Sequence, residues 1–112
     1  MRAAFLIILL LALAGCGSQT DKQLAAVKSA RSVLSEWALV EQQADAGRAP
    51  STYVEQMREL AKDQLKTASK GLSGQPEAAN LIDGLRERKP GATSLQHAAS
   101  VLEPLEKHLE AA

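Results

Sequence analysis

Hydrophobic and polar residues follow two different patterns along this chain of 112 residues. Residues 3–14 are all apolar, whereas from Asp21 onward apolar residues recur every three or four positions among charged ones. A spacing of three and four places the apolar side chains on one face of a helix. No stretch alternates with a period of two, and β-branched residues are sparse. The pattern therefore predicts an all-α domain that follows an apolar leader.

The first helix is predicted over Asp21–Ala46, because neither glycine nor proline occurs before Gly47. Asp21 would lie in the first turn, where the helix dipole favours an acidic side chain, and Gly47 is typical of the residue that ends a helix. The expected buried face consists of Leu24, Ala26, Val27, Ala30, Val33, Leu34, Trp37, Ala38, Val40 and Ala44. We expect Trp37 in the core, with a role as an anchor for a partner as the alternative.

The second helix is predicted over Thr52–Lys70, with Thr52 and Glu55 spaced as in a capping box and Gly71 as its C-cap. The expected buried side consists of Tyr53, Met57, Leu60, Ala61, Leu65, Ala68 and Leu72. The charges on the exposed side alternate in sign three residues apart, which predicts ion pairs of Glu55 with Arg58, Glu59 with Lys62 and Asp63 with Lys66.

Two further helices are predicted in the second half of the chain. A short one covers Glu77–Arg88 after Pro76, which suits the first position of a helix. The last begins at Thr93 or Ser94, with Thr93 to Gln96 as a second candidate capping box. The residues expected to face inward are Ala78, Leu81, Ile82, Leu85, Leu95, Ala98, Leu102, Leu105 and Leu109.

Pro104 lies inside the last predicted helix, where it cannot donate a backbone hydrogen bond to Ser100. The apolar spacing continues past it, so we expect a bend near Ser100 rather than a break. Together the four segments predict an all-α, small antiparallel helical bundle of three long helices and one short helix, joined by short turns.

The apolar leader has the layout of a secretory signal peptide. Arg2 supplies a positive charge, residues 3–14 form the apolar region, and small residues follow. The apolar run is too short to cross a bilayer, which requires about 20 residues. A cleaved leader is therefore favoured over a membrane-spanning helix.

Leu13-Ala14-Gly15-Cys16, at the end of this leader, resembles the lipobox of bacterial lipoprotein precursors. The resemblance covers residues 1–17 only. It implies that a peptidase recognises Leu13, Ala14 and Gly15 and cuts before Cys16. It also implies that the Cys16 thiol receives a diacylglyceryl group and its new amino group an acyl chain such as palmitate. The alternative is an ordinary signal peptide followed by a cysteine without lipid.

The resemblance divides the chain into a signal peptide (1–15), a lipidated tether (16–20) and a helical body (21–112). Two or three acyl chains on one residue make a stable membrane anchor, whereas one does not. Gly17 follows the cysteine, where aspartate would resemble an inner-membrane retention signal. We therefore expect an anchor in the cell envelope, in the outer membrane facing the periplasm if two membranes are present.

Composition argues against several chemistries. The chain has 13 basic and 13 acidic residues, so no excess of positive charge favours nucleic acid. His97 and His108 would lie about 16 Å apart along one helix, too far to share a zinc ion. No nucleophile motif is present, and Cys16 is the only cysteine. We expect no metal site, no cofactor-binding residues and no catalytic residues.

These observations predict a lipid-anchored, non-enzymatic helical protein that binds an unidentified envelope protein or serves structurally. Such a role predicts an exposed apolar groove or patch. The alternative is a small-molecule or lipid carrier, which requires a cavity of about 300 Å³ or more between helices. An enzyme would require a cleft that gathers ionisable groups with shifted pKa values.

Overall fold

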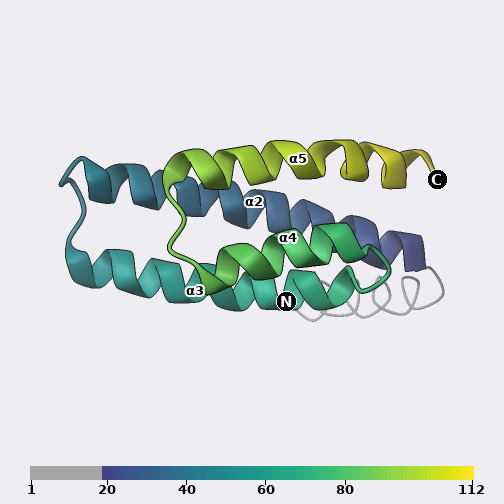
Figure 1. The fold of residues 1–112 in the computed structure, drawn as a ribbon, viewed down its shortest axis with the longest axis horizontal. Helices are drawn as coiled ribbons and strands as arrows, with labels where there is room; N and C mark the ends of the chain where they lie inside the picture. Colours follow the sequence, from purple (N-terminus) through teal and green to yellow (C-terminus); the bar gives the residue numbers. More distant parts are fainter. Residues whose placement is uncertain (1–18) are drawn as a thin grey trace, which may run out of the picture.

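The computed structural model describes residues 19–112, and this part of the chain forms four α-helices without any β-strand. The helices are α2 (Gln19–Asp45), α3 (Ser51–Gly71), α4 (Pro76–Glu87) and α5 (Ala92–Ala111) (Figure 1). The all-α fold of three long helices and one short one is confirmed. The predicted leader, with Leu13, Ala14, Gly15 and Cys16, lies outside the described residues.

Each helix runs antiparallel to the next along the chain, so the bundle goes up, down, up and down (Figure 1). α2 packs against both α3 and α5, and α4 packs on α3. Among neighbouring helices, α4 and α5 have the fewest contacts with each other. The bundle is therefore closed along three seams and loosely packed along the fourth. None of the helices within residues 19–112 is long and apolar enough to cross a bilayer.

The start of α2 corrects one predicted boundary. Within the described residues α2 already includes Gln19 and Thr20, two residues before the predicted start at Asp21. Both residues are compatible with a first turn, and Asp21 lies there as expected. The described part of α2 consequently starts three residues after Cys16.

The end of α2 confirms the role predicted for Gly47. Gly47 has a φ of 68°, in the left-handed region that favours glycine. Its N–H donates to the Ala44 carbonyl at 3.1 Å, and the Arg48 N–H donates to the Gln43 carbonyl at 2.9 Å. This pair of hydrogen bonds is the Schellman motif, which satisfies carbonyls at the end of a helix.

Both predicted capping boxes are wrong. α3 begins at Ser51 after Pro50, and α5 begins at Ala92 after Gly91, with no side-chain cap at either start. Pro50 and Gly91 have extended backbones, so each helix starts directly after them. Thr52 and Thr93 therefore lie inside the first turn, two positions after the residue that would cap it.

Gly71 has a different role from the predicted C-cap. It is the last residue of α3, and its backbone is not left-handed. A Cβ atom at Gly71 would come within 2.8 Å of the Ala26 Cβ on α2. The absence of a side chain at Gly71 therefore lets α3 and α2 approach closely at this end of the bundle.

One apolar core runs through all four helices. Trp37 is 2% exposed, so its predicted place in the core is confirmed. The predictions for Tyr53 and Leu60 are wrong, since they are 43% and 48% exposed, while Val54 is buried instead. The physical reason is that the first half of α3 extends beyond α4, so α2 is the one helix that packs against it (Figure 1).

α5 continues through Pro104 as one helix, so the expectation of no break is confirmed, while the bend near Ser100 stays a prediction. Arg31 of α2 supports this region. Its Nε donates to the Ala99 carbonyl at 3.2 Å, and its Nη1 lies 2.7 Å from the Glu106 carboxylate. These bonds tie α2 to α5 on both sides of the proline.

Candidate functional site

The loosely packed seam between α4 and α5 contains a cleft of about 600 Å³. The cleft is partly open to solvent, and it lies where the short α4 passes into α5 through residues 88–91. It is lined by Leu81, Leu85, Arg88, Lys89, Pro90, Gly91, Thr93, Ser94, His97 and Ala98. Leu85 and Ala98 are buried members of the core, so the floor of the cleft is apolar and fixed by packing. An apolar floor beside polar side chains makes this cleft a candidate binding site.

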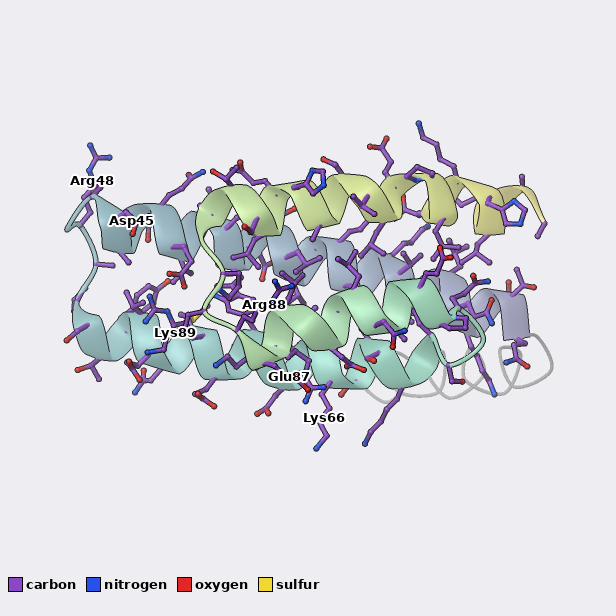
Figure 2. All side chains as sticks on the ribbon, in the orientation of Figure 1. Asp45, Arg48, Lys66, Glu87, Arg88 and Lys89 are labelled. Carbon is purple, nitrogen blue, oxygen red and sulfur yellow. The ribbon has the colours of Figure 1, made fainter. Side chains whose placement is uncertain are left out.

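Basic side chains line the mouth of this cleft. Arg88 and Lys89 belong to the connection between the helices, and His97 lies one turn into α5. Figure 2 shows Arg88 and Lys89 beside that connection, whereas Lys66 on α3 points away into solvent. None of the residues that line the cleft is acidic. An anionic group would therefore meet positive charge there without a competing carboxylate in the lining.

The same connection separates the cleft from a second cavity of about 340 Å³. Arg88, Lys89, Pro90 and Gly91 line both spaces. The second cavity has mixed charge, with lining from α2 and α3 that includes Trp37, Glu41, Asp45, Glu55, Arg58, Glu59 and Lys62. Its acidic and basic residues are equal in number, so it lacks the charge preference of the cleft.

A buried carboxylate stabilises the wall of the second cavity. Glu41 on α2 is 6% exposed. It accepts hydrogen bonds from Trp37 Nε1 at 2.8 Å, from Arg58 Nε at 2.8 Å and from Arg58 Nη2 at 2.7 Å. The paired bonds from Arg58 form the fork geometry that guanidinium groups make with carboxylates. This cluster fixes α3 against α2 beside the α4–α5 connection.

The hydrogen bonds from Arg58 hold the pKa of Glu41 below its ordinary value, although burial acts in the opposite direction and Trp37 adds a smaller lowering effect. The pKa of Arg58 is raised, mainly by its hydrogen bond to Glu41. Both groups therefore remain charged at neutral pH and form a structural pair. The pair leaves no free acid–base group at this position.

Of the three ion pairs predicted on the surface of α3, Glu55–Arg58 is confirmed and the other two are wrong. Arg58 reaches Glu55 only at 4.0 Å, because its main partner is Glu41 on the neighbouring helix. Within the described residues, the predicted partners of Lys62 and Lys66 form no ion pair with them. Arg58 therefore pairs mainly with Glu41 across helices and only at longer distance with Glu55 along α3.

Of the two histidines that were excluded as joint zinc ligands, one lies in the cleft. His97 lines the cleft, while His108 is exposed near the end of α5. Within residues 19–112, no group of three or more histidine, cysteine, aspartate or glutamate side chains is placed to hold a metal ion. The lipobox residues lie outside this range.

Sequence reasoning missed Arg88, Lys89 and Glu41. Arg88 and Lys89 precede Pro90-Gly91, and basic residues next to a turn were a signal that we did not use. Glu41 lies four residues after Trp37, on the face expected to be apolar. An acid at that position signals a buried partner, but nothing in the sequence identifies that partner as Arg58.

Comparison with known proteins does not assign the chain to a class. No protein-family model, no curated protein and no solved structure matches it. The function is therefore argued from the lipobox resemblance, the bundle and the cleft alone.

Proposed function

We propose that this protein is a lipid-anchored, non-enzymatic interaction module of the bacterial cell envelope, held in the membrane through Cys16. The observation that carries the proposal is the start of α2 at Gln19, three residues after the lipobox cysteine. Three residues span at most about 11 Å. A rigid bundle would therefore stand directly on the anchor, without a long stalk.

The order of the helices determines which end of the bundle would lie near the proposed anchor. The first turn of α2, the turn between α3 and α4 and the end of α5 lie at one end (Figure 1). The turn between α2 and α3 lies at the other end, and the α4–α5 connection lies towards it (Figure 1). Glu41, beside that connection, lies about 33 Å along α2 from Gln19 at 1.5 Å per residue. An anchor at Cys16 would place the cleft away from the bilayer, where another envelope protein can reach it.

The cleft favours binding over catalysis. Ser94 and His97 both line it, but no carboxylate in the lining is available to orient the histidine. Nucleophilic catalysis requires a base that is itself oriented by a third group. Ser94 and His97 are therefore better suited to donate hydrogen bonds to a bound partner than to catalyse a reaction.

A second candidate function is that of a small-molecule or lipid carrier. It is favoured by the volume of the cleft, about 600 Å³, since ligand pockets measure about 300–1,000 Å³. It is weakened by the partly open shape of the cleft, which would leave much of an apolar ligand in water.

Mass spectrometry of the mature amino terminus tests the anchor. We expect the chain to begin at Cys16 with its mass raised by diacylglyceryl and acyl groups, and to sediment with membranes. Cys16→Ala should remain uncleaved and carry no lipid, whereas the matched variant Ser18→Ala should be processed normally. An unmodified thiol, or a different first residue, would refute the proposal.

Crosslinking in native membranes tests the interaction. The lipidated protein should form a specific crosslinked product with an envelope protein, and Cys16→Ala should reduce its yield. A protein that shows no crosslinked product in its own membrane would contradict a role in interaction.

A further inference from the structure

We propose that the cleft between α4 and α5 binds a peptide segment of a partner protein that carries carboxylates next to an apolar side chain. The carboxylates would contact Arg88 and Lys89, and the apolar side chain would lie against Leu81 and Leu85. This inference rests on the proposed function, because it names the chemistry of the partner that the envelope module would recognise.

Unpaired positive charge is the first argument. Arg88 Nε donates to the Gly84 carbonyl at 3.1 Å, which holds the side chain over the end of α4. Within residues 19–112, neither Arg88 nor Lys89 forms an ion pair with an acidic side chain. Arg31, Arg58 and Arg86 do form such pairs. The guanidinium of Arg88 is therefore free to bind a carboxylate of a partner through two parallel hydrogen bonds.

The apolar floor is the second argument. Leu85 is 5% exposed and Ala98 is 1% exposed, and both belong to the core that joins the helices. Leu81 is partly buried and packs against that core. An apolar side chain of a partner would enter a preformed surface, and little conformational entropy would be lost on binding.

The open shape of the cleft favours a peptide over an acyl chain. An acyl chain has apolar atoms on all sides, and its exposed half would remain in water at a cost of about 25 cal/mol per Å². A peptide can place one side chain in the cleft while its polar backbone faces solvent. The distance of the cleft from the proposed anchor likewise favours a protein partner over lipid from the same bilayer.

Binding of defined peptides to the full chain in phosphatidylcholine nanodiscs tests the inference. The probe is a fluorescent peptide that alternates glutamate and leucine, and its anisotropy reports binding against empty nanodiscs. Two matched peptides alternate lysine with leucine and glutamate with serine. We expect saturable binding of the glutamate–leucine peptide, with at least tenfold weaker binding of the other two.

Variants of the cleft locate the binding site. Reversing both charges, with Arg88→Glu and Lys89→Glu, should weaken binding of the glutamate–leucine peptide at least tenfold. Ser94→Trp should weaken it similarly by filling the cleft, because Ser94 is an exposed residue of its lining. The matched controls are Lys66→Glu on α3 and Gln96→Trp on α5, both exposed and outside the lining, and they should bind as the wild type does.

Three results would overturn the inference. They are equal binding of the lysine–leucine peptide, unchanged binding by Ser94→Trp, and competition by palmitate stronger than that by unlabelled peptide. Lipidation of Cys16 is measured on the same samples. If the chain is lipidated but binds no peptide, only this inference fails, whereas an unlipidated chain refutes the proposed anchor independently of peptide binding.

Discussion

At the scale of single residues, Glu41 is a buried charged side chain whose contacts hold two helices together. Its carboxylate lies in the interior of the bundle and is neutralised by Arg58 from another helix. Buried charges of this kind are retained only when hydrogen bonds compensate for lost hydration. Trp37 supplies one of these bonds, which links the largest side chain of the core to the charged pair.

The lowered pKa of Glu41 predicts an acid-sensitive component of stability. Because the pKa is lower in the folded chain than in the unfolded chain, the stabilisation is complete above the unfolded value of about 4.3. It is lost as the pH falls through the folded value. We expect Glu41→Gln to reduce the free energy of unfolding by about 1–2 kcal/mol at pH 7, and by progressively less below about pH 4. Urea titrations followed by the fluorescence of Trp37, the only tryptophan, measure both values.

A matched control isolates the buried carboxylate. Glu55 also faces Arg58, but at 4.0 Å and with 75% of its side chain exposed. Glu55→Gln should therefore change the free energy of unfolding by less than about 0.5 kcal/mol at any pH. If the difference between wild type and Glu41→Gln stayed constant down to pH 3, the paired carboxylate would not be the source of the acid sensitivity.

At the scale of helices, the apolar spacing was sufficient to predict the elements but not all of their contacts. The four helices and their type followed from the spacing, and Gly47 and Pro76 marked an end and a start correctly. The prediction that Tyr53 is buried on α3 was wrong, because burial there depends on the length of α4 and not on the residues of α3. Periodicity gives the apolar side of a helix, whereas the neighbours decide how much of that side is covered.

The candidate site was less predictable than the helices. A cleft arises from the loose packing of α4 on α5, which is a property of two helices together. The lining residues Leu81 and Ala98 were predicted as inward-facing, but the sequence could not show that a cavity separates them. The resemblance to a lipobox, by contrast, is local in sequence and needs no structure to be noticed, and it stays a prediction because Leu13 to Cys16 lie outside the described residues.

Substitutions of two glycines by alanine test how closely the helices pack. Gly71→Ala should lower the free energy of unfolding by about 1–3 kcal/mol, because its Cβ would meet the Ala26 Cβ at 2.8 Å and the helices would have to separate. Gly84→Ala in α4 is the matched control, since only the flexible end of Arg88 lies near, at 3.4 Å. It should be neutral or stabilise by up to about 1 kcal/mol through helix propensity. Urea unfolding measures both, and equal effects would contradict close packing at Gly71.

At the scale of the whole molecule, the sequence order of the helices determines what each end presents. α2 starts at one end immediately after the proposed anchor, and its 27 residues carry the chain to the other end. The helix spans about 40 Å at 1.5 Å per residue. The turn that holds Arg48 is thus at the far end of the body, while Ser73 in the turn after α3 is at the near end (Figures 1 and 2).

This geometry predicts that labels at the two turns differ in their distance from the membrane. Because lipidation would block the only native cysteine, a cysteine introduced by Ser73→Cys or Arg48→Cys can be labelled alone. In vesicles with quencher on the lipid headgroups, a fluorophore at Ser73→Cys should be strongly quenched, whereas one at Arg48→Cys, about 40 Å away along the bundle, should not. Both positions are exposed, so neither label should disturb the core. Equal quenching would mean that the bundle lies flat on the bilayer, and the cleft could then face the lipid surface rather than a partner.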